Sequence, residues 1–208
     1  MKVKNIYYAL FLVIIFVSIF FYFKIDREKK KKNPTITDLA LEPDVLINTA
    51  DRSLHDHKKL AAIAFLDDAI EMMKLLEKDG DDVSMQAIEL AIKDLEIVEE
   101  HIKAEDINDD LMYEAFADAM NSLAYASLRV SEKLIQEGKL KEADITLEHA
   151  MDHLQNSIRF ARGEQKEDEL VIVAHLQEIM DNHLQNDISK IDEVMAEIDS
   201  VVQAHVIK

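Results

Sequence analysis

The order of apolar and polar residues divides the chain into one continuous apolar stretch and several stretches in which apolar residues recur every three or four positions. The continuous stretch is residues 6–23, IYYALFLVIIFVSIFFYF, which carries no charge. The clearest periodic set is Ile88, Ala91, Leu95, Val98 and Ile102. Because one helical turn takes 3.6 residues, this spacing places the apolar side chains on one face of a helix. The pattern predicts an all-α protein.

Turn-forming residues are scarce and fall where the periodic stretches stop. The chain has only 3 Gly and 2 Pro, too few for a protein of many strands and turns. Gly80, Gly138 and Gly163 each follow a helical pattern, as expected of glycine just past a helix end. We therefore expect an antiparallel bundle of about five long helices, formed by two helical hairpins and a long C-terminal helix. The expected ranges are 44–77, 82–102, 108–136, 140–162 and 165–206.

The apolar stretch 6–23 predicts an N-terminal transmembrane helix. Eighteen residues rise by about 27 Å in a helix, close to the thickness of the hydrocarbon core. No small residues follow it as a signal-peptidase site would require, so we expect a retained single-pass anchor in the cell membrane. Six of the eight basic residues in 1–32 follow the span, which favours the body on the cytoplasmic side. The basic amino tail leaves the periplasmic or extracellular side open.

Charge separates the anchor from the body. We expect an anchor with a basic flank at 1–32, a proline-containing linker at 33–43 and an acidic helical bundle at 44–208. Residues 33–208 hold 16 basic and 40 acidic residues, a formal charge of −24. Such a field repels nucleic acid, so we expect no nucleic-acid partner. The absence of cysteine excludes disulfides, thiolate metal sites and a cysteine nucleophile.

Candidate chemistry rests on one histidine pair. His149 and His153 lie four apart in LEHAMDHL, a spacing that can hold one metal ion on a helix. Both are rotated away from the apolar stripe of the expected helix 140–162, and a third ligand would have to come from elsewhere. We interpret them as solvated surface residues and expect no metal or other cofactor. The chain also lacks HExxH, Glu-x-x-His, Walker and GxGxxG motifs, so we expect no enzyme.

The C-terminal stretch carries the longest periodic apolar set, here called the C-terminal seam. Its members alternate four and three apart, as in a coiled coil. This spacing predicts either packing against the other four helices or binding of a protein partner or a second copy. The seam consists of Leu184, Ile188, Ile191, Met195, Ile198 and Val202.

The turn and helix sequence EGKLKEADITLEHAMDHL, with its apolar helix, glycine turn and following KEA-type helix, resembles bacterial YfdX-family proteins over Leu54 to Ala161. That resemblance implies a helical protein with a stress-related role and transfers no site residues. From the residues themselves we expect a membrane-anchored, non-enzymatic interaction or scaffold module. It would contact the bilayer through residues 6–23 and a protein through its acidic surface and the C-terminal seam. The alternatives are a metal- or ligand-binding sensor and a stress-related YfdX-like protein.

Overall fold

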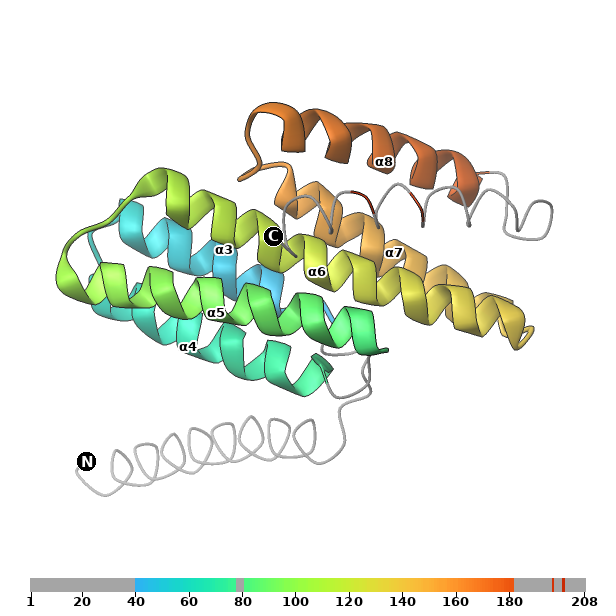
Figure 1. Cartoon of the computed structure of the whole chain (residues 1–208), viewed down its shortest axis with the longest axis horizontal. Coiled ribbons are helices and arrows are strands. Elements are labelled where there is room, and N and C mark those ends of the chain that lie inside the picture. Colours follow the sequence, from blue (N-terminus) through green and yellow to red (C-terminus); the bar gives the residue numbers. More distant parts are fainter. Residues whose placement is uncertain (1–39, 78–80, 182–195, 197–199, 201–208) are drawn as a thin grey trace, which may run out of the picture. The chain divides into compact units, whose positions relative to one another are not determined.

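The computed structural model describes residues 40–77, 81–181, 196 and 200, which form helices and no strand (Figure 1). This confirms the predicted all-α class. The helices belong to a compact unit, Leu39–Lys208, in which each helix packs against the next in chain order. They are α3 (Glu42–His55), α4 (Lys59–Leu76), α5 (Asp82–Ala104), α6 (Asp109–Gln136), α7 (Leu140–Ser157) and α8 (Gly163–Asp181).

The first predicted helix, 44–77, is in fact two helices. Between α3 and α4, His57 adopts a left-handed backbone with φ of 58°, and the Lys58 amide donates to the Ser53 carbonyl at 2.7 Å. The HDHKK sequence at this turn has no apolar side chain, so a straight helix would bury nothing there. Folding α3 back on α4 instead places Ile47 and Leu66 in one core cluster. The gain in buried apolar area outweighs the cost of one left-handed residue.

Polar side chains cap the amino ends of α5 and α6. The Asp81 carboxylate accepts a hydrogen bond from the Ser84 amide at 2.8 Å. The Asn108 side chain accepts from the amides of Asp110 and Leu111 at 3.1 and 3.3 Å. The first-turn amides of a helix have no partner within it, and side-chain oxygens supply one. The cap at Asn108 fixes the start of α6, one residue after the expected start of the helix at 108.

Gly138 ends α6 as predicted. Its φ of 75° is left-handed, and the Lys139 amide that follows donates to the Leu134 carbonyl at 2.8 Å. Such a bond across the helix end satisfies a carbonyl that would otherwise lack a donor. The turn sends α7 back along α6, and the contacts between these two helices are the most extensive of the bundle.

The fourth predicted helix, 140–162, is shorter than expected. α7 ends at Ser157, whose carbonyl accepts from the Phe160 amide at 2.8 Å. The turn places Phe160 in the core, edge-on to Phe116 with ring centroids 5.3 Å apart. Gly163 is the first residue of α8 and does not cap α7. Burial of an aromatic ring favours the turn over a further helical turn in solvent.

α6 is the central helix of the bundle, with alanines and larger apolar residues on several of its faces. Residues 115–125 are all buried. The first core cluster joins the amino-terminal half of α6 to α3, α4 and α5, and the second joins its carboxyl-terminal half to α7 and α8. Small side chains on α6 allow its neighbours to approach closely on every side.

Some predictions concern residues outside this description. The predicted membrane segment 6–23, its basic flank and all six residues of the C-terminal seam lie there. Among the described residues, none of the helices combines the length and the apolar character that crossing a bilayer requires. After Asp181, only Ala196 and Ser200 are described, and both are helical and exposed.

Candidate functional site

A buried ion pair or hydrogen-bonded pair links α3 to α7. His153 Nδ1 lies 2.8 Å from Asp44 Oδ1, and the two side chains are 1% and 2% exposed. Asn156 donates from Nδ2 to the other carboxylate oxygen of Asp44 at 2.9 Å. Asp44 also lies in the first turn of α3, where the helix dipole favours a negative charge. Both oxygens of this buried carboxylate are therefore matched by donors, as burial requires.

The structure overturns the surface interpretation of the predicted histidine pair. His153 is buried because α3 packs its first turn on a second side of α7, while His149 is half-buried. Burial, followed by the nearby His153, lowers the pKa of His149. Nδ1 of His153 is directed to Asp44, so that nitrogen is already engaged in the interior. Within residues 40–77 and 81–181, no group of three or more potential ligands is placed to hold a metal ion.

A second buried polar cluster is centred on Glu169 of α8, whose side chain is fully buried. Asn121 Nδ2 donates to Glu169 Oε1 at 2.7 Å, and Ser157 Oγ lies 3.1 Å from the same oxygen. In the described part of the chain, Glu169 Oε2 and Asn121 Oδ1 have no hydrogen-bond partner. Burial raises the pKa of Glu169 to about 7, although hydrogen bonds from Asn121, Ser157 and Gln165 favour its charged form.

The surroundings of Glu169 supply few donors for a charge. The single hydroxyl proton of Ser157 faces two acceptors, because Oγ is also 3.1 Å from the Ala117 carbonyl. Gln165 donates to Asp118 of α6 at 3.2 Å, so part of its amide is also engaged. A buried carboxylate oxygen without a donor is costly when charged, whereas a proton on Glu169 Oε2 removes that charge. The lack of a donor to Glu169 Oε2 therefore favours the neutral acid.

The two polar clusters are adjacent on α7, since Asn156 belongs to one and Ser157 to the other. Together they connect α3, α6, α7 and α8 through the interior. Their central side chains are buried, so no substrate in solvent reaches them. We infer that the two clusters fix the relative positions of these four helices.

Sequence reasoning did not single out Asp44, Asp118 or Glu169. One signal was available for Glu169. The buried residues of α8 are spaced four, three, four and three apart, so the carboxyl group occupies a position in the apolar stripe. They are Gln165, Glu169, Ile172, Leu176 and Ile179.

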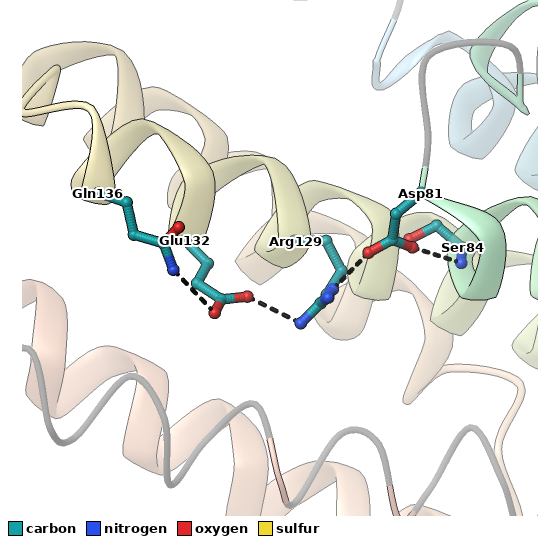
Figure 2. A network of polar contacts seen from close by, with 5 residues as sticks. All are labelled: Asp81, Ser84, Arg129, Glu132 and Gln136. Atoms are coloured by element: carbon teal, nitrogen blue, oxygen red, sulfur yellow. Dashed lines mark hydrogen bonds and ion pairs between the residues drawn. The ribbon is translucent and has the colours of Figure 1, made fainter.

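The surface of α6 carries a groove of about 470 Å³. Figure 2 shows the polar side chains beside it. Arg129 donates from Nε to Asp81 Oδ2 at 2.6 Å and from Nη1 to Glu132 Oε2 at 2.8 Å. Gln136 Nε2 donates to the other oxygen of Glu132 at 3.3 Å. The lining residues are Asp81, Ala126, Arg129, Val130, Glu132, Lys133 and Gln136.

The charges in this groove are largely balanced. The hydrogen bond to Asp81 is the main cause of the raised pKa of Arg129. Burial acts to raise the pKa of Asp81, but the hydrogen bonds from Ser84 and Arg129 outweigh it and leave that pKa below its usual value. Arg129 is already held by two carboxylates, so the groove is not built to capture an anion. Ala126 and Val130, four apart on α6, add a partly exposed apolar strip.

Comparison with known proteins gives no relative from which a function could be transferred. No family model matches the chain, and no curated protein or solved structure is significantly similar to it. The resemblance to the YfdX family stays a prediction.

Proposed function

We propose that this chain is a non-enzymatic helical interaction module, held at a membrane by residues 6–23, that binds a protein partner or a second copy through its C-terminal seam. One observation carries the proposal. Ala196 and Ser200, in the stretch that contains the seam, are helical and exposed. On a helix, positions 196 and 200 lie roughly opposite the seam positions, which supports binding through the seam.

The surface chemistry of the body supports binding in preference to catalysis. Its polar clusters tie helices together in the interior, and its groove holds paired charges. Large apolar side chains remain at the surface, including Leu60, which is 83% exposed, and the adjacent Leu170 and Val171 on α8. Anchoring at a membrane would raise the local concentration of such surfaces for partners at the same membrane.

The test uses the intact chain, expressed with a purification tag and recovered from membranes. The seam variant is Ile191→Asp with Ile198→Asp, and the matched control is Ala196→Asp with Ser200→Asp, which adds the same charge to the exposed face. Partners are captured by proximity labelling, and self-association is measured by light scattering in detergent. We expect the control to retain its partner or oligomer and the seam variant to lose it.

Identical capture by both variants would show that the seam is not the contact. Circular dichroism at 222 nm on each variant checks that the helices remain folded. Extraction of membranes with alkaline carbonate tests the anchor separately, because a chain that spans the bilayer stays with the membrane pellet. Release of the intact chain into the supernatant would contradict the membrane part of the proposal.

A further inference from the structure

The buried face of α8 changes character along the helix. Near its start, Gln165 and Glu169 form hydrogen bonds with side chains of α6 and α7. Further along, Ile172, Leu176 and Ile179 pack in the second core cluster. The first core cluster, by contrast, is formed in the described part of the chain by α3 to α6 and by the turn after α7. Release of α8 would therefore leave the first core cluster intact.

The turn before α8 has the features of a hinge. Phe160 and Ala161 are buried in the first core cluster, and the Arg162 guanidinium lies 4.9 Å from the centre of the Tyr113 ring. Gly163, the first residue of α8, has a left-handed backbone with φ of 53°, and open space surrounds the position that a Cβ would take. Glycine adopts left-handed and right-handed conformations with similar ease. The helix can therefore change direction at Gly163 while the turn stays fixed on the bundle.

Glu169 makes the docking of α8 depend on a proton. Its side chain is fully buried, and within the described residues Oε2 has no hydrogen-bond donor. A negative charge on that oxygen is costly in the interior, whereas water hydrates it once α8 has left the bundle. Docking therefore favours the protonated side chain, and release favours the ionised one.

The charged groups around Glu169 do not offset this cost. On α6, Asp118 is another buried acid. On α8 itself, Asp168 acts after burial to raise the pKa of Glu169 further. On α7, His153 is engaged by Asp44 of α3. Of the ion pairs within residues 40–77 and 81–181, none includes Glu169, so its charged form has no cationic partner there.

We propose that Glu169 is a pH-sensitive latch, whose protonated form holds α8 against α6 and α7 and whose ionised form lets α8 swing away at Gly163. Release opens the second core cluster and exposes Ile172, Leu176 and Ile179, while the first core cluster stays closed. The latch is independent of the proposed membrane anchor and of the C-terminal seam.

The size of the effect follows from proton linkage. The pKa of Glu169 is about 7 in the docked state, and its ordinary value of 4.5 applies once the side chain is in water. Because the docked state binds the proton more tightly, release becomes more favourable as pH rises through this window. These two pKa values raise the equilibrium constant for release by about 70-fold between pH 5 and pH 8.

Hydrogen exchange with mass spectrometry on the full chain in detergent micelles tests the latch. A helix without tertiary contacts is only marginally stable in water, so the amides of a released α8 lose their protection. The parent is compared with Glu169→Gln, which cannot ionise, and with Glu167→Gln, which removes an exposed charge from the same helix. Exchange of α8 and α5 is followed at pH 5 and pH 8, with several urea concentrations below the unfolding transition. Dividing the parent rate by the variant rate at the same pH cancels the intrinsic pH dependence of exchange.

We expect the ratio of parent to Glu169→Gln rates in α8 to be about 70-fold larger at pH 8 than at pH 5. The α8 rates should depend only weakly on urea, because release exposes little surface, whereas α5 should exchange more slowly and with a steep urea dependence. Glu167→Gln should follow the parent at both pH values.

Two results would overturn the latch. The first is an α8 ratio that changes by less than about tenfold between the two pH values, since proton linkage at Glu169 would then not control release. The second is an α8 that exchanges at the rate and with the urea dependence of α5, because α8 would then open only when the whole bundle unfolds.

Discussion

Replacement of Glu169 by glutamine tests whether the interior of this bundle holds a neutral acid. Glutamine has the shape of the protonated side chain, and its amide oxygen can still accept the hydrogen bond from Asn121. It cannot ionise. The variant therefore removes only the charge that would develop in a fully buried site.

The magnitude follows from the pKa. Burial raises the pKa of Glu169 from 4.5 to about 7 in the folded protein. A difference of one pKa unit corresponds to about 1.4 kcal/mol, so ionisation in place would cost about 3 kcal/mol. The free energy of unfolding of a typical domain is about 5 to 15 kcal/mol, so this cost is a large fraction of it.

The sign of the pH dependence is fixed by which state holds the proton. Between pH 4.5 and about 7, the folded state retains the proton of Glu169 while the unfolded chain has released it. The free energy of unfolding therefore falls as pH rises through this window and is level above it. Glu169→Gln should match the parent near pH 4 and exceed it by up to about 3 kcal/mol at pH 8.

The assay is urea unfolding of the full chain in detergent, followed by circular dichroism at 222 nm from pH 4 to 8.5. Comparison with the parent at each pH cancels the other titrating groups, among them Asp51, whose pKa is also raised by burial. Glu167→Gln, an exposed position on the same helix, is the matched control. Parallel curves for Glu169→Gln and the parent, less than about 0.5 kcal/mol apart at every pH, would refute the reasoning.

Two further predictions concern the packing of the bundle. His153→Ala should lower the free energy of unfolding by about 3 kcal/mol or more, because it leaves the buried Asp44 carboxylate without one donor. His149→Ala should lower it by less than about 1 kcal/mol. Equal losses for the two variants in urea unfolding would show that the His153–Asp44 contact adds no stability. Asn108→Ala should cost about 1 kcal/mol through loss of the α6 cap, and Asn108→Asp should restore it, so an Ala variant as stable as the Asp variant in the same assay would contradict the cap.

The helices that were predicted well have strong local signals. α5 and α6 begin at polar caps and contain long apolar stripes, so their bounds agree with the expected ranges to within two residues. The break between α3 and α4 has no glycine or proline to mark it. Its cause is the burial of Ile47 and Leu66 in one cluster, a contact between positions 19 residues apart that local propensity does not encode.

The candidate site was predicted less well than the fold. His153 was assigned to the surface because a helical wheel shows only one apolar stripe on α7, and the contact with Asp44 joins residues 109 apart in sequence. Glu169 could have been suspected from its place in the α8 stripe, but its partners come from α6 and α7. Whether a polar residue is buried depends on which helix packs over it.

The sequence by itself determined the helical class and the bounds of α5 and α6, because these depend on periodicity and on neighbours within one or two turns. Only the tertiary structure decided where the first helix breaks, which side of α7 is covered and which carboxyl groups lose contact with water. The physical reason is that desolvation and long-range hydrogen bonds are set by the packing of several helices at once, and no single stretch of the chain contains that information.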